Sequence, residues 1–320
     1  MKASGEESQI RRDIVGYGAT PPIAEWPGGR RMALSIVLNY EEGSERTPAY
    51  GDSVHELSTE ARYDVKLEDR ELIQESTFEY GSRVGHWRIL DLLDRYRAKC
   101  TVFACGMALE QNPAIAEALV QRGHDIAGHG YRWIPHYGMS EAEEREDVRR
   151  AIASIRAMTG VKILGWFTRP VPTTHTRRIL AEEGLLYDCT AVNDDLPYFD
   201  RVADRPFLIL PYSLDTNDIR FWKGFAFTAQ DFFEYMRDTF DTLYAESLHT
   251  PRMMSVGLHG RVVGRPGRIV ALERFLEHVS RFDDVWIAGR DDIAKHWLQR
   301  FAPPNTWNLS SLPTSIPEDR

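Results

Sequence analysis

Short apolar segments alternate with amphipathic segments along most of this chain of 320 residues, and this alternation constrains its fold more than any other feature. The clearest apolar segment is 32–39, MALSIVLN, a nearly continuous run that is typical of a strand buried on both faces. Similar runs recur at 100–105, 125–127, 162–167, 187–191, 207–211, 253–258 and 285–288. The pattern predicts about eight strands, most of them joined by helical crossovers in a parallel sheet.

Helical spacing or capping signals stand between these runs. Ser140 and Glu143 form a capping box at the start of one such segment. The helices expected are 84–97, 113–122, 140–159, 176–183, 228–246 and 267–281. An open doubly wound sheet and a (β/α) barrel both satisfy this order, but no GxGxxG motif follows a strand, so a dinucleotide-binding fold has no support.

The two ends differ in composition from the middle, so we expect a single catalytic domain over 30–300, with arms at 1–29 and 301–320. The polar stretch 45–77 interrupts the alternation, as a functional loop or an oligomer contact does. The chain has 42% hydrophobic residues, enough for a large core, and no apolar run of membrane-spanning length.

Charge and cysteine content narrow the classes of partner. The chain carries 39 basic and 48 acidic residues, a net charge of −9, and has no Lys/Arg block, so we expect no nucleic-acid partner. The first residues form no apolar signal segment, and the three cysteines form no CxxC motif. We therefore expect a cytoplasmic protein with reduced thiols and no membrane partner.

Polar residues follow several predicted strands. They lie at the carboxyl ends of the strands, where parallel barrels have their catalytic residues. Glu41 and Glu42 follow the first strand as a carboxylate pair suited to acid–base work, although such a pair can also lie on a solvated loop. His129 lies between two glycines after the third strand, and Arg169 lies in a proline-rich loop after the fourth. His259 directly follows the seventh predicted strand, 253–258.

Seven stretches together resemble the polysaccharide deacetylase family, also called the NodB-homology or carbohydrate esterase 4 family, over roughly 30–290. They are NYEEG at 39–43, EYGSRVG at 79–85, GHGYRWI at 128–134, GW at 165–166, DDLPYF at 194–199, LDTNDIRF at 214–221 and LHGRVVGRPGR at 258–268. The stretches look like the branch of cofactor-independent allantoinases and cyclic imide hydrolases. The resemblance implies a distorted (β/α) barrel of about seven to eight parallel strands, and a homo-oligomer, expected to be a tetramer.

The resemblance also implies roles for single residues. Glu41 falls at the position of the family's base and Glu42 at that of a metal ligand. His129 matches the first histidine of the family's metal motif, but Trp133 replaces the second. A divalent ion such as zinc would keep only Glu42 and His129, fewer than the three protein ligands usual in catalytic zinc sites, so we expect no metal cofactor.

We therefore expect ring opening of a cyclic amide. Glu41 or Glu42 takes a proton from water, and His259 protonates the leaving nitrogen or steadies the oxyanion. Arg169, Arg83 or backbone N–H groups hold the carbonyl oxygen or a substrate carboxylate. The residues expected to bind the substrate are His129, Trp133, Glu79, Tyr80, Arg83 and Asn217.

Two rival readings stay open. One is a metal-dependent N-deacetylase of an N-acetylated sugar, which needs a third metal ligand, with His136, His86 and His175 as the candidates. The other is a non-catalytic binding protein on the same scaffold, which would have no need of the acid–base residues Glu41, Glu42 and His259. Fold alone does not choose between these readings.

Overall fold

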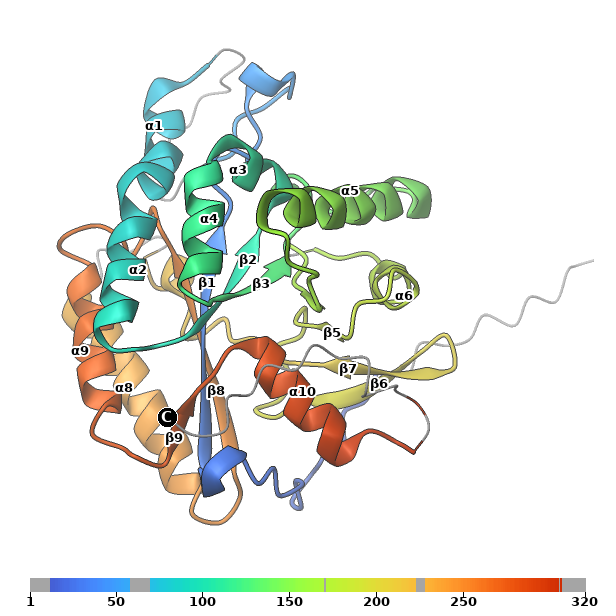
Figure 1. Ribbon diagram of the computed structural model, residues 1–320, viewed down its shortest axis with the longest axis vertical. Coiled ribbons are helices and arrows are strands. Elements are labelled where there is room, and N and C mark those ends of the chain that lie inside the picture. Colours follow the sequence, from blue (N-terminus) through green and yellow to red (C-terminus); the bar gives the residue numbers. More distant parts are fainter. Residues whose placement is uncertain (1–11, 58–69, 170, 223–227, 305, 307–320) are drawn as a thin grey trace, which may run out of the picture.

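Strand β1 (Met32–Tyr40) forms the centre of the molecule, and all nine of its residues are buried. The computed structural model describes residues 12–57, 70–169, 171–222, 228–304 and 306. It places β8 (Arg252–His259) along one side of β1. On the other side, β9 (Val285–Ile287) pairs with the first residues of β1 and β2 (Cys100–Ala104) with the last. Figure 1 shows β1 and β8 running together through the middle of the molecule.

The remaining strands extend the sheet beyond β2. Their order is β3 (Asp125–Gly128), β4 (Gly165–Trp166), β5 (Tyr187–Asp188), β7 (Arg205–Ile209) and β6 (Tyr198–Val202). Every pairing is parallel except that of β6 with β7. The sheet curls into an incomplete barrel with flanking helices (Figure 1), so the predicted distorted (β/α) barrel is confirmed. The described residues hold eight parallel strands, and the antiparallel β6 was not predicted.

Helical elements connect the strands. They are η1 (Pro27–Gly29), η2 (Pro48–Tyr50), α1 (Leu72–Tyr80), the π-helical turn η3 (Gly81–Gly85), α2 (His86–Arg95), α3 (Gly106–Gln111), α4 (Pro113–Gln121), α5 (Glu141–Thr159), α6 (Thr176–Glu182), α7 (Asp218–Phe221), α8 (Ala229–Glu246), α9 (Ile269–Val279) and α10 (Arg290–Phe301). The capping box of Ser140 and Glu143 starts α5 as predicted. Helices α1, α3, α7 and α10 were not predicted.

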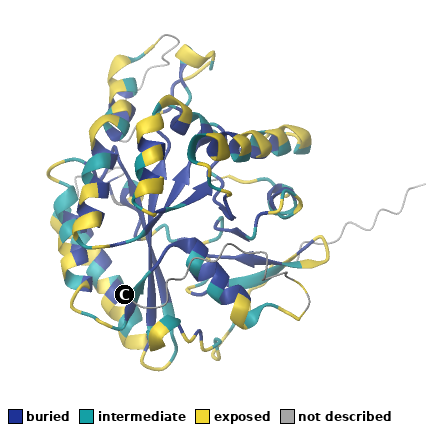
Figure 2. Ribbon diagram, in the orientation of Figure 1, coloured by how far each residue is buried: buried dark blue, intermediate teal, exposed yellow. Residues whose placement is uncertain are grey.

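Two apolar clusters cover the two faces of the sheet. Alternate residues of β1, such as Leu34 and Ile36, join the cluster beneath the outer helices α2, α4, α5, α8 and α9. The intervening Ala33 and Val37 face the barrel interior, where α10 packs through Trp297 and its neighbours. Figure 2 shows the strands buried and the outward sides of the helices exposed. A strand between two apolar layers has to be apolar throughout, which explains the run at 32–39.

The predicted arms are described only in part. Within the N-terminal arm, Trp26 is buried, and its ring lies 5.9 Å from those of Trp286 and Trp297. Residues 1–11 and most of the C-terminal arm lie outside the described residues, so the predicted boundaries stay predictions. No helix in the described ranges is long and apolar enough to cross a membrane.

The edge strands of the sheet are β6 and β8, and the barrel is open between the antiparallel pair β6–β7 and β8, a gap that we call the seam. In the described residues, one isolated bridge, between Asn217 and Gly257, joins the segment after β7 to β8. A groove of about 830 Å³ lies along the seam, lined by 192–195, 211–216, α8 and the first half of β8. The ladder bonds that would close a regular barrel are therefore largely missing here.

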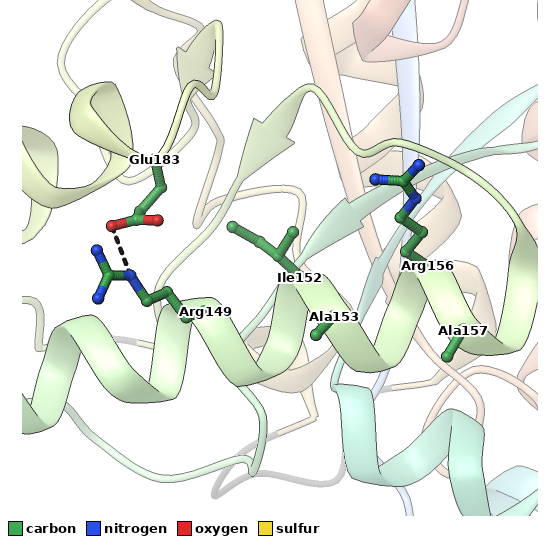
Figure 3. A pocket seen from close by; sticks show the side chains of 6 residues that line it. All are labelled: Arg149, Ile152, Ala153, Arg156, Ala157 and Glu183. Atoms are coloured by element: carbon green, nitrogen blue, oxygen red, sulfur yellow. Dashed lines mark hydrogen bonds and ion pairs between the residues drawn. The ribbon is translucent and has the colours of Figure 1, made fainter.

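A second hollow, of about 580 Å³, lies on the outer surface of α5 (Figure 3). In it Arg149 reaches Glu183 at the end of α6, with 2.9 Å between Nε and Oε1. The lining residues are Arg149, Ile152, Ala153, Arg156, Ala157 and Glu183. None of them was selected from the sequence as a candidate site residue.

The segment that follows β3 is anchored by His136, which is buried. Its Nδ1 lies 3.0 Å from Glu144 Oε1 and its Nε2 3.2 Å from Asp147 Oδ2, both on α5. Burial opposes the charged imidazolium, but hydrogen bonds and charges from Asp147 and Glu144 outweigh it and raise the pKa of His136 to about 9. The protonated ring therefore ties this segment to α5.

We expect the free energy of unfolding to fall as the pH rises from about 6.5 to about 9. The unfolded chain loses the His136 proton near its ordinary pKa while the folded chain keeps it, so the stabilisation is complete below that range. At ~1.4 kcal/mol per pKa unit the contribution is on the order of 3 kcal/mol. Urea titrations at several pH values check this, and His136→Asn should flatten the slope; an equal slope in both proteins would contradict the assignment.

Candidate active site

Parallel register brings four of the predicted residues together at the carboxyl ends of the strands. Asn39 of β1 lies opposite His259 at the end of β8, so Glu41 emerges from β1 beside that histidine. Ala104 of β2 lies opposite Gly128, which places His129 beside the exit of β2. The side chains of Glu41, Glu42, His129 and His259 are at most 5% exposed.

Glu41 is the hub of this cluster. Its Oε1 lies 3.3 Å from His129 Nε2 and 3.4 Å from His259 Nε2, while its Oε2 lies 2.7 Å from Arg261 Nη2. The Nδ1–H of His129 donates to the carbonyl oxygen of Phe167 at 2.6 Å, and the two rings stack. That second bond fixes the plane of the ring and directs Nε2 at Glu41.

Glu42 occupies a separate, tighter pocket. The Nε2–H of His86 donates to its Oε2 at 2.8 Å, and Arg261 Nη1 lies 3.4 Å from its Oε1. A Cβ atom on Gly81, in the π-helical turn, would stand 2.2 Å from Oε1 of Glu42. The pocket therefore requires glycine at position 81, and it leaves Glu42 no free face toward a substrate.

Both carboxylates are held in the ionised form. Burial alone would raise the pKa of Glu41, but Arg261, His259 and a hydrogen bond from His129 hold it well below its usual range. Burial likewise opposes ionisation of Glu42, but His86 and Arg261 lower its pKa to about 2. Fixed cations thus outweigh the cost of burying two adjacent negative charges.

His259 is held in the protonated form by Asp218, at the first position of α7. Its Nδ1–H donates to Asp218 Oδ1 at 2.6 Å, and its backbone N–H donates to Oδ2 at 2.8 Å. Burial disfavours the charge, but Asp218 and then Glu41 raise the pKa of His259 to about 9. A proton is therefore available on Nε2 at neutral pH.

Two guanidinium groups lie over the ring of Trp133. Its ring is 3.8 Å from the guanidinium carbon of Arg169 and 5.0 Å from that of Arg261. Arg169 also pairs with both carboxylate oxygens of Glu56, at 2.5 and 2.9 Å, and donates to the carbonyl of Trp133 at 2.6 Å. The structure therefore gives Arg169 a contact that positions Trp133, and its predicted role in catalysis stays a prediction.

The other predicted substrate-binding residues do not join the cluster around Glu41. Glu79 and Arg83 are exposed and lie 3.6 Å apart as a surface ion pair. Tyr80 accepts a hydrogen bond from Arg88 at 2.8 Å. Asn217 is buried, accepts from Ile219 N at the start of α7 and donates to Tyr212. Their predicted roles in binding stay predictions.

Three residues that hold the cluster together were not selected from the sequence for a metal-independent site: His86, Asp218 and Arg261. Arg261 follows His259 by two positions, and Asp218 follows Asn217 directly, so both lay inside quoted stretches. The available signal was a charged residue beside a strand exit. Each joins the cluster through a contact with a distant segment, which spacing along the chain does not reveal.

The donor set does not fit a resident divalent ion. The guanidinium of Arg261 faces both Glu41 and Glu42, and Glu42 is also bonded to His86, so the oxygens that would bind an ion already meet fixed cations. The indole of Trp133 flanks that guanidinium and offers no ligand atom. In the part of the chain that the structure describes, no three His, Cys, Asp or Glu side chains are arranged to hold a metal.

Comparison with known proteins agrees with this geometry. A putative polysaccharide deacetylase of Schizosaccharomyces pombe is 35% identical over 311 residues, which cover 89% of this chain and 96% of that protein. The chain belongs to the polysaccharide deacetylase family. The model of the polysaccharide deacetylase family matches residues 69–183. This deacetylase-family chain is therefore a hydrolase acting on carbon–nitrogen bonds.

Two solved structures are similar over almost the whole of this deacetylase-family chain. A probable polysaccharide deacetylase from Pseudomonas aeruginosa PAO1 is 46% identical with a TM-score of 0.86, and covers 91% of this chain and 98% of its own. The allantoinase PuuE is also 46% identical, with a TM-score of 0.87 and the same coverage. The family resemblance drawn from the seven sequence stretches is thereby confirmed.

We expect Asp218→Asn to lower the pKa of His259 from about 9, because the amide removes the charge that most favours the imidazolium. Titration of the His259 ring resonance by NMR measures the change, with the resonance assigned by its absence in His259→Asn. Asp215→Asn, an exposed position on the same segment, is the matched control and should leave the titration unchanged. An unshifted His259 in Asp218→Asn would show that another group sets its pKa.

Proposed function

We propose that this deacetylase-family enzyme hydrolyses a ring C–N bond of a cyclic ureide or cyclic imide without a metal ion. The observation that carries the proposal is the guanidinium of Arg261 at 2.7 Å from Glu41 and 3.4 Å from Glu42. In this arrangement a side-chain cation neutralises the carboxylates, which a divalent ion would otherwise have to do. The similarity to the allantoinase PuuE supports this class of substrate.

Glu41 is the carboxylate suited to act as the base. It faces the two imidazoles at its Oε1, whereas Glu42 is enclosed by His86, Arg261 and Gly81. The low pKa of Glu41 keeps it ionised but also makes it a weak base. A cyclic imide or ureide carbonyl is more electrophilic than that of an ordinary amide, so a weak base suffices for this class.

The reaction balances with these groups. Glu41 takes a proton from water as the water oxygen bonds to the ring carbonyl carbon. The ring C–N bond then breaks as His259 Nε2–H gives its proton to the leaving nitrogen. The proton on Glu41 returns His259 to its charged form across the 3.4 Å between Oε1 and Nε2, so the site is restored. Glu42 keeps Arg261 in place throughout.

The decisive assay is a substrate panel of allantoin, hydantoin, dihydrouracil, succinimide and N-acetylglucosamine, with and without a chelator. We expect ring opening of a cyclic member at an unchanged rate after chelation, and a loss of ~10²–10⁴-fold in kcat for Glu41→Gln. Glu117→Gln, an exposed change on α4, should keep full activity. Acetate release that depends on added zinc would favour the N-deacetylase, and no turnover of any member would favour a binding protein.

The pH profile gives an independent check. We expect kcat/KM to decline above a pH of about 9, where His259 loses the proton that it donates, and Glu41 to impose no loss near neutral pH because its pKa lies well below the usual range. Asp218→Asn should move the alkaline limb to lower pH. The difference between the two proteins is the quantity of interest, because ionisation of the substrate affects both equally.

A further inference from the structure

Arg290, the first residue of α10, is a fully buried arginine inside the barrel. Its Nη1 donates to the carbonyl oxygens of Leu210 at 2.8 Å and Pro211 at 3.1 Å. Its Nη2 donates to Pro211 and to the hydroxyl of Ser255. Nη1 also lies 3.4 Å from Cys189 Sγ. Among the described residues, no carboxylate pairs with this guanidinium.

Burying an arginine against neutral partners is unfavourable unless its donors meet groups that would otherwise lack them. Among the described bonds the carbonyl of Leu210 accepts from Arg290 alone, whereas that of Pro211 also accepts from the Ser255 hydroxyl at 3.4 Å. Leu210 and Pro211 directly follow β7, and Ser255 lies in β8, so the guanidinium spans the seam where strand-to-strand bonds are missing. The guanidinium is an internal clamp that replaces part of the missing ladder.

The clamped segment continues to the active site. Tyr212 follows Pro211, and its hydroxyl accepts from Asn217 Nδ2 at 3.0 Å and from Asn39 Nδ2 at 3.4 Å. A Cβ at position 257 of β8 would stand 1.9 Å from that hydroxyl, so Gly257 makes room for it. Tyr212 thereby joins the segment 210–217 to β1.

At its other end this segment carries Asp218. The backbone of Thr216 accepts from Gly257 N at 2.9 Å, and Asn217 caps α7 through a bond from Ile219 N at 3.0 Å. Asp218 follows at once and holds both Nδ1 and the backbone N–H of His259. The position of Asp218 therefore depends on how firmly 210–217 is fixed.

We propose that Arg290 is a positioning residue of the active site, which closes the barrel seam and thereby fixes Asp218 against His259. The role of His259 as the general acid rests on the proposed function, but the contact between Asp218 and His259 does not. Arg290 itself touches neither of these residues in the bonds described, and acts through Leu210, Pro211 and the segment that follows them.

The test is the titration of His259 by NMR in Arg290→Gln. We expect the pKa of His259 to fall, as in Asp218→Asn, because a loosened segment holds Asp218 against the ring for less of the time. In the active enzyme, kcat should fall by on the order of 10²-fold, the loss that a displacement of about 1 Å can cause, with KM little changed. Arg290→Lys, which keeps the charge but only one donor centre, should shift the pKa less.

A double-mutant comparison separates positioning from general stability. If Arg290 acts through Asp218, Arg290→Gln should change the pKa of His259 no further in the Asp218→Asn background. Trp297→Phe, which alters packing on the same helix, should lower the melting temperature and leave the His259 titration unchanged. If Arg290→Gln does not fold, Ser255→Ala removes one partner of the clamp and should give a smaller shift in the same direction.

An unchanged His259 pKa in folded Arg290→Gln or Ser255→Ala would overturn the proposal, and so would additive shifts in the double mutant. Because the NMR titration needs no turnover, this outcome is distinct from a failure of the proposed function. An enzyme inactive on every cyclic amide could still show the shift, and an active enzyme could lack it.

Discussion

The arrangement of the site depends on one cation shared by two adjacent buried carboxylates. β1 delivers Glu41 and Glu42 together to the edge of the sheet, where few water molecules can solvate them. Without Arg261 between them, burial and mutual repulsion would push at least one into the protonated form. Arg261 lies 2.7 Å from Oε2 of Glu41 and 3.4 Å from Oε1 of Glu42, and the other oxygen of Glu41 faces the two imidazoles while that of Glu42 meets His86. The two like residues therefore have different surroundings.

Burial also explains why the Nδ1 atom of each imidazole has a hydrogen-bond acceptor within the protein. The side chains of His129 and His259 are 1% and 5% exposed, so the protein has to supply the hydrogen bonds that water cannot. Phe167 does this for His129 with a carbonyl, and Asp218 does it for His259 with a carboxylate. The neutral acceptor and the charged one give the two rings different electrostatic surroundings.

The sequence predicted the parts of the fold whose signal is local. The run 32–39 predicted a strand covered on both faces, and the capping box at Ser140 predicted the start of α5; both are confirmed. Helix α10 was missed because Arg290 and Lys295 are polar residues at buried positions, which hides the apolar spacing of a helix. The half-buried β6 was missed because its residues show no apolar run.

The site was predictable to a similar extent. Strand exits identified Glu41, Glu42, His129 and His259, since parallel register alone brings such positions together. Their partners were not selected, because a contact such as that of His86 with Glu42 joins residues 44 positions apart. The exposed pair Glu79 and Arg83 shows a different limit of sequence-based prediction. A conspicuous local motif was selected, but its charged side chains lie on the solvent-exposed surface.

The π-helical turn at Gly81–Gly85 joins α1 to α2 and changes the directions in which their side chains point. In a regular α-helix, residues eight positions apart point about 80° away from each other. A π turn absorbs roughly one extra residue, so Phe78 and His86 face nearly the same direction, as residues seven apart would. Phe78 can then flank Arg261 while His86 reaches Glu42. Removing one residue from the turn would restore a regular α-helix and keep both side chains aligned, whereas adding one would turn the histidine away from its carboxylate.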